Sequence, residues 1–151
     1  MIYEQPYEGI QNTMDWFKVQ MLDGWDYAQN NVPLFTSPRQ LWNWLKLRTT
    51  FVHDPANEEL LQSLPTLLEN NWHGIPGAGD CDCFALAAAT IMAEQGIPNS
   101  IMLVGKRKSH PVHIYNVVYW DGQRYILDFA NPYFNQERTQ YKYFQEIPVG
   151  I

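Results

Sequence analysis

The chain has 151 residues, of which 46% are apolar and 15% aromatic, so it can bury one hydrophobic core but is too short for two ordinary domains. Its formal net charge is −6 and its only basic run is Lys106-Arg107-Lys108, which argues against nucleic acid as the main partner and favours a neutral or cationic peptide. No segment approaches the roughly 18 apolar residues of a membrane span, and residues 1–10 lack a signal-peptide pattern. The sequence therefore predicts a cytoplasmic protein with no membrane contact.

Secondary-structure signals are weak over residues 1–36 and strong over the next twelve residues. Residues 1–36 are rich in Asn, Gln and aromatic residues without a clean period, which predicts an irregular or partly helical extension. Ser37 is then a predicted N-cap, Pro38 suits the first helical position, and Gln40 completes a capping box. We predict a helix from there to Arg48.

A second helix is predicted to begin at Asp54-Pro55 and to run up to Pro65. Its apolar positions would be Leu60, Leu61 and Leu64. A loop with several glycines follows over residues 70–79.

The central element is predicted between Asp82 and Gln95, where the apolar residues surround the helix axis almost completely, which is typical of a helix buried on most of its surface. Gly96 is placed to be its C′ residue. Three strands follow, at 101–104, 113–120 and 123–129. The last two are joined by Asp121-Gly122, which predicts a type I′ hairpin turn.

These elements predict an α+β fold in which a central buried helix packs on a small antiparallel sheet. The whole chain is expected to form one domain, with a core over about 37–132. The N-terminal extension covers residues 1–36. An aromatic tail over 133–151 is expected to wrap back onto the body.

The run from Gly79 to Ala85 (GDCDCFA) places a thiol where a glycine turn gives way to the central helix. The first N–H groups of a helix have no intrahelical partner and carry the positive end of the dipole, so they favour a thiolate at Cys81. Asp80 is the predicted N-cap. Cys83 points about 200° away around the helix and is predicted to pack in the core. A disulfide between the two cysteines would be strained and would close almost no loop.

A histidine and an aspartate complete a candidate acyl-transfer site. If the hairpin turn has two residues, Trp120 opposes Gln123, and the register then places His113 and Asp128 as diagonal neighbours on one face. Cysteine, histidine and aspartate together predict a thiolate–imidazole pair whose imidazole is held by a carboxylate. Asn131 is an alternative partner for the ring.

The same residue types also supply the ligands of a structural zinc site, through Cys81, Cys83, His110 and His113. The cysteine spacing is shorter than is usual for such sites, and His110 falls in a polar loop where it is predicted to be solvated. We therefore expect no metal and no cofactor.

With these motifs in place, residues from about 51 to 132 resemble the transglutaminase-like superfamily, within the papain-like cysteine peptidase fold, and its short microbial and phage members in particular. The resemblance rests on the Gly79–Ala85 run, the alanine-rich helix that follows it, His113-Ile114-Tyr115 and Leu127-Asp128. It implies Cys81 as nucleophile and a bacterial or phage source. The chain differs from the family at Cys83, where Asp is common, and at Tyr115, where Trp is frequent.

The predicted function is thiol-dependent acyl transfer on an amide bond of a peptide or protein. Hydrolysis by a cysteine peptidase or amidase is favoured, transamidation by a protein-crosslinking transglutaminase is the alternative, and a non-catalytic binding module is a third. The backbone N–H of Cys81 is a candidate oxyanion donor, with the side chain of Gln62 or Trp72 as the second.

Overall fold

The computed structural model of the chain describes residues 2–4, 10–53, 60–69, 75–107, 111–137 and 140–150. The helices and strands follow one another as β1 (Ile2–Glu4), α1 (Ile10–Asn31), α2 (Pro38–Arg48), β2 (Thr50–Phe51), β3 (Leu60–Gln62), α3 (Leu64–Glu69), β4 (Ala78–Gly79), α4 (Cys81–Glu94), β5 (Asn99–Gly105), β6 (His113–Trp120), β7 (Gln123–Leu127) and β8 (Tyr143–Pro148). The fold is α+β, as predicted.

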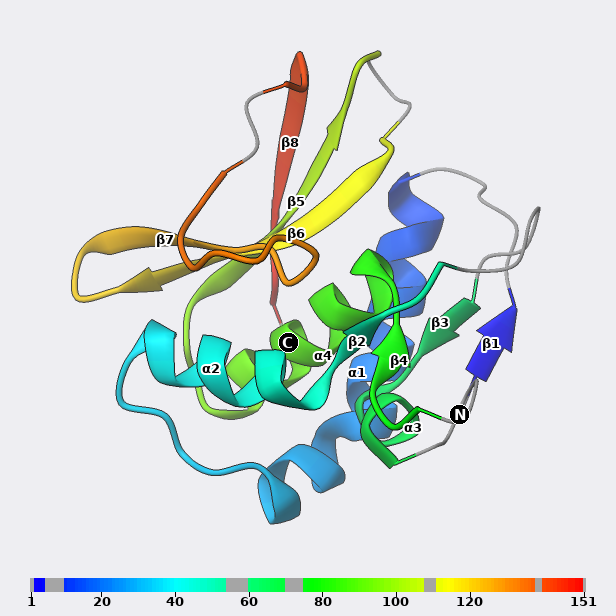
Figure 1. The fold of residues 1–151 in the computed structure, drawn as a ribbon, viewed down its shortest axis with the longest axis vertical. Helices are drawn as coiled ribbons and strands as arrows, with labels where there is room; N and C mark the ends of the chain where they lie inside the picture. Colours follow the sequence, from blue (N-terminus) through cyan, green and yellow to red (C-terminus); the bar gives the residue numbers. More distant parts are fainter. Residues whose placement is uncertain are drawn as a thin grey trace.

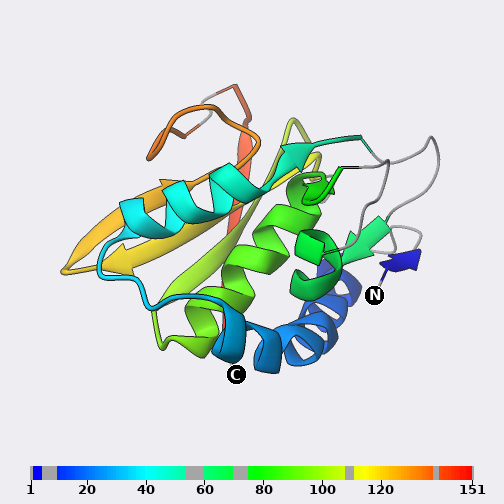
Figure 2. The same ribbon diagram turned by 60° about the horizontal axis from the view of Figure 1, so that its bottom comes forward.

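The main sheet is antiparallel, with strand order β7-β6-β5-β8 (Figure 1). Two small sheets pair β1 with β3 and, in parallel, β2 with β4. Figure 2 shows α4 lying against one face of the main sheet, and α1 packs along α4. None of the helices in the described part of the chain is both long and apolar enough to cross a bilayer.

Helix α4 is buried along most of its length and is the centre of the core, which confirms the predicted central helix. Asp80 is its N-cap, with extended backbone and a carboxylate that accepts from the N–H of Cys83 at 3.5 Å. Its other end is a Schellman motif. Gly96 has φ +71°, and the N–H groups of Gly96 and Ile97 donate back into the last turn at 3.1 and 2.8 Å.

The β6–β7 hairpin has the predicted turn and register. Asp121 and Gly122 both have positive φ (50° and 75°), as a type I′ turn requires, and Trp120 pairs with Gln123. Strand β7 ends at Leu127, whereas the sequence predicted a strand to Phe129. It ends there because the Asp128 carboxylate accepts from the N–H of Ala130 at 3.2 Å and so begins a turn.

The N-terminal region is more regular than the sequence predicted, because 22 of its residues form the single helix α1. Its buried positions other than Gln20 are spaced alternately by three and four residues, at Met14, Phe17, Met21, Gly24 and Ala28. Gly24 brings α1 close to its neighbours, since a Cβ there would lie 3.2 Å from the Cβ of Leu64.

The helix predicted between residues 54 and 65 is wrong where the structure describes it. Leu60 and Leu61 belong to β3, which pairs with β1, and the helix α3 begins only at Leu64. Pro65 therefore lies in the first turn of α3, where its missing N–H costs no hydrogen bond. The start predicted at Asp54-Pro55 falls outside the described residues.

The predicted helix α2 is confirmed, with the Ser37 hydroxyl accepting from the N–H of Gln40 at 3.2 Å. The tail also returns to the body as predicted, because β8 pairs with β5 from Ser100 to Gly105. However, the side chains of Tyr143 and Phe144 remain 46% and 44% exposed. The tail is therefore held by its backbone ladder and by other side chains, with Tyr141, Ile147 and Val149 packing against buried clusters.

Candidate functional site

Cys81 is the first residue of α4, and two sets of hydrogen bonds hold the backbone next to it. The Asp80 cap anchors the first turn. The N–H of Val52 donates to the carbonyl of Gly79 at 2.7 Å, which extends the β2–β4 pairing to the residue before the cap. The thiol therefore lies at a helix N-terminus, as predicted, where a negative charge on sulfur is favoured.

The Cys81 side chain is half-buried and packs against an apolar cluster from α1, α4 and the sheet. Its Sγ lies 3.7 Å from Oδ1 of Asp82, close enough for a weak S–H···O hydrogen bond. The Asp82 carboxylate favours the protonated thiol and so opposes the effect of the helix N-terminus. This opposing effect of Asp82 was not predicted from the sequence.

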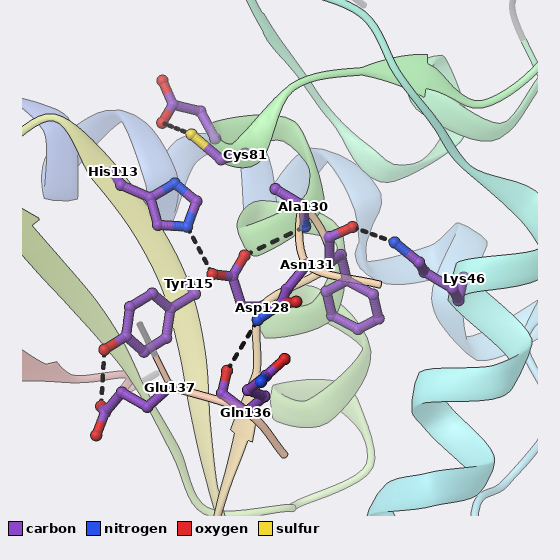
Figure 3. A network of polar contacts seen from close by, with 11 residues as sticks. Lys46, Cys81, His113, Tyr115, Asp128, Ala130, Asn131, Gln136 and Glu137 are labelled. Carbon is purple, nitrogen blue, oxygen red and sulfur yellow. Dashed lines mark hydrogen bonds and ion pairs between the residues drawn. The ribbon is translucent and has the colours of Figure 1, made fainter. Parts of the chain in front are cut away.

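His113 and Asp128 are in contact, as the predicted register requires. The Nε2 atom of His113 lies 2.7 Å from Oδ2 of Asp128, and the two side chains are only 7% and 1% exposed. Figure 3 shows Cys81 on the side of the imidazole away from Asp128. With Nε2–H donating to Asp128, the nitrogen left to exchange a proton with the thiol is Nδ1.

Two tyrosine rings, those of Tyr115 and Tyr141, flank His113. They belong to a cluster with Val104 and Val117 on the face of the main sheet away from α4, which we call the outer sheet face. The Tyr115 ring lies 5.8 Å from the imidazole, and the Tyr141 ring stacks on it at 6.2 Å with an interplanar angle of 20°. The Tyr115 hydroxyl donates to Glu137 at 2.7 Å (Figure 3). Burial and the Glu137 carboxylate raise the pKa of Tyr115 well above its ordinary value, so its hydroxyl remains a donor.

Lys46 supports the turn that carries Asp128, a role with no signal in the local sequence. Its Nζ donates to the carbonyl of Phe129 at 2.6 Å and so links α2 to the residue after the aspartate. Burial lowers the pKa of Lys46, an effect that the nearby Asp128 carboxylate partly offsets.

Gln62, predicted as an oxyanion donor, is fully buried beneath the start of α4. Its amide nitrogen donates to the carbonyl of Ala78 at 2.8 Å and lies 3.8 Å from the Sγ of Cys83. Its carbonyl oxygen has no hydrogen-bond partner among the described residues. Trp72, the other candidate donor, falls outside the part of the chain that the structure describes.

The remaining alternatives are placed as follows. Cys83 is fully buried in the core cluster, as predicted. Asn131, the alternative partner for the His113 ring, instead donates from its amide nitrogen to the carbonyl of Gln136 at 3.3 Å. The side chain that contacts the His113 ring at 2.7 Å is the Asp128 carboxylate. His110 lies outside the described residues, and within them no three His, Cys, Asp or Glu side chains gather closely enough to hold a metal ion.

No family model matches the sequence, and no curated protein matches it at a significant level. Among solved structures, the chain is similar to the putative cysteine protease from Cytophaga hutchinsonii, with a TM-score of 0.42 and 14% sequence identity. The match covers 78% of this chain and 37% of that one, so this chain spans little more than a third of that protein's length. No residue role is transferred from a similarity at that level.

Proposed function

We propose that this protein catalyses thiol-dependent acyl transfer on an amide bond, as a cysteine peptidase or amidase with a papain-like or transglutaminase-like core. The observation that carries the proposal is the buried His113–Asp128 contact of 2.7 Å, together with the half-buried Cys81 at the first residue of α4, which Figure 3 shows on the opposite side of the imidazole. A buried imidazole held by a carboxylate next to a cysteine is the arrangement that activates a thiol nucleophile.

In the proposed reaction, Nδ1 of His113 takes the Cys81 proton and the thiolate attacks the amide carbonyl carbon. As the tetrahedral intermediate collapses, the imidazolium gives its proton to the amide nitrogen, the C–N bond breaks and the amine leaves. The acyl group is then on sulfur as a thioester. His113 next takes a proton from a water molecule, and the resulting hydroxide attacks the thioester carbon. The C–S bond breaks, the carboxylic acid leaves, and the imidazolium returns its proton to the Cys81 sulfur.

The backbone N–H of Cys81 is the first candidate donor to the oxyanion, because the N–H groups in the first turn of a helix have no acceptor within the helix. Gln62 is a weaker second donor than the sequence predicted, because both of the contacts made by its amide nitrogen are already internal. To reach a substrate it would have to give up its bond to the Ala78 carbonyl. Trp72 stays a prediction.

The proposal is tested by the pH dependence of Cys81 alkylation by iodoacetamide from pH 4 to 10, followed by peptide mapping. We expect Cys81 to react with an apparent pKa well below the roughly 8.5 of a free thiol, and the His113→Ala variant to lose that acceleration. The buried Cys83, mapped in the same digest, is the internal control for unfolding. A Cys81 that stays inert until denaturation would contradict the proposal.

A second assay separates hydrolysis, amine transfer and simple binding. The native protein and its Cys81→Ala variant are incubated with a peptide library, with and without a fluorescent primary amine, and the products are identified by mass spectrometry. Cleaved peptides lost in the variant support a hydrolase. Amine-labelled glutamine side chains identify a transglutaminase. Peptides retained equally by both proteins, without turnover, identify a binding module.

A further inference from the structure

Tyr141 stacks on the imidazole of His113 at the outer sheet face. Its ring lies 6.2 Å from the imidazole and is nearly parallel to it, at 20°. The residue comes from the segment between the Asp128 turn and β8, a part of the chain that the mechanism above does not use.

The position of this ring is fixed by the sheet. The N–H of Lys142 donates to the carbonyl of Gly105 at 3.2 Å, which continues the β5–β8 pairing beyond the start of β8. The Tyr141 ring also packs on the buried cluster of the outer sheet face, which includes Val104 and Tyr115. Val104 is the cross-strand partner of His113, so the same patch supports both rings.

We propose that Tyr141 is a positioning residue that holds the His113 imidazole flat and keeps water away from its bond to Asp128. The inference rests on the proposed function, because only an imidazole that exchanges protons with Cys81 gains from a fixed orientation. A hydrogen bond in a dry environment is stronger than one open to water. The low exposure of both partners, 7% and 1%, is the condition that the ring helps to maintain.

The Tyr141 hydroxyl makes no hydrogen bond with any of the residues that the structure describes. The ring alone therefore carries the effect, which gives a sharp pair of variants: Tyr141→Phe keeps the ring, whereas Tyr141→Leu removes it and stays apolar. Tyr133→Leu makes the same change at a tyrosine that is 66% exposed and has no contact with His113, so it is the matched control.

The test is the imidazole Nε2–H proton of His113, observed by NMR in protein labelled with ¹⁵N-histidine and assigned by its loss in His113→Ala. We expect a slowly exchanging signal in the native protein, Tyr141→Phe and Tyr133→Leu, and exchange with water at least tenfold faster in Tyr141→Leu. If a substrate is found, Tyr141→Leu should lower kcat about tenfold with KM changed less than twofold, which is about 1.4 kcal/mol in the activation free energy.

The outcomes distinguish the two proposals. An unchanged Nε2–H exchange rate in a folded Tyr141→Leu protein overturns the role of Tyr141, whatever the activity. Tenfold faster exchange in a protein whose Cys81 proves unreactive supports the positioning of the ring and overturns the proposed function. Should Tyr141→Leu fail to fold, as judged by near-UV circular dichroism, Tyr141→Met is used with the same expectations.

Discussion

Replacement of Asp128 by Asn tests the candidate site most directly, because each oxygen of the buried carboxylate accepts a hydrogen bond from a different donor. Oδ2 accepts from His113 at 2.7 Å, and Oδ1 accepts from the N–H of Ala130 at 3.2 Å. A carboxamide has one acceptor oxygen and one NH₂ donor. In either orientation, the introduced asparagine can satisfy only one of these two partners in the native way.

Each orientation has a calculable consequence. With its oxygen toward His113, the NH₂ group faces the Ala130 N–H, and the buried donor–donor contact costs about 1–3 kcal/mol. With its NH₂ toward His113, the ring must accept at Nε2, so its proton moves to Nδ1, the nitrogen facing Cys81, and the neutral imidazole cannot act as base. We expect the Asp128→Asn variant to populate the second orientation strongly, with alkylation of Cys81 at pH 6.5 slowed by about 10²-fold.

The measurement combines the alkylation rate with the ¹⁵N chemical shifts of His113, which report the tautomer directly. Asp121→Asn is the control, because Asp121 lies in the exposed hairpin turn away from the ring. A variant that keeps the proton on Nε2 and reacts within threefold of the native rate would refute the assignment of Asp128 as the orienting group.

Three further predictions follow from the same region and from the core. Asp82→Asn should speed the alkylation of Cys81 at pH 6 severalfold, because the carboxylate 3.7 Å from its Sγ disfavours the thiolate. An unchanged pH profile of the alkylation rate would contradict this. Gly79→Ala should lower the free energy of unfolding, measured by urea titration, by about 1–3 kcal/mol, because the new Cβ would lie 2.9 Å from Leu67 and 3.0 Å from Cys83. The control Gly150→Ala has open space around the new Cβ and should change the free energy of unfolding by less than about 0.5 kcal/mol. Burial and the Glu69 carboxylate raise the pKa of Tyr27 from 10.0 to about 12, so the folded state favours its neutral form. The free energy of unfolding should therefore fall as the pH rises from 10 towards 12, and this fall should be shallower in Tyr27→Phe.

The sequence predicted the hairpin and the central helix because their signals are local. A type I′ turn and a period-two strand fix which residues face each other, and so the contact between His113 and Asp128 could be derived from the turn alone. The Asp80 cap and the Gly96 terminus likewise depend only on neighbouring residues. The roles of the site residues remain predictions.

The parts that the sequence described poorly depend on distant partners. The apolar spacing of α1 is interrupted by Gly24, whose place in the helix is explained only by the approach of Leu64. Leu60 and Leu61 fit a helix as well as a strand, and their pairing with β1 decides for the strand. The bond from Lys46 to the Phe129 carbonyl spans 83 residues and has no local signature.

The three candidate residues share one structural property, which is that each lies at the end of an element or directly after it. His113 begins β6 and Asp128 follows β7, so the antiparallel hairpin closes their separation of 15 residues without a long loop. Cys81 begins α4, which packs on β6 with its N-terminus at that same end of the sheet (Figure 1). Asp128 and His113 are buried, with the Tyr115 and Tyr141 rings against the imidazole, while Cys81 remains half-buried. This asymmetry suits the proposed chemistry, because the nucleophile must reach a substrate, whereas the imidazole needs access only to the thiol, the leaving amine and one water molecule.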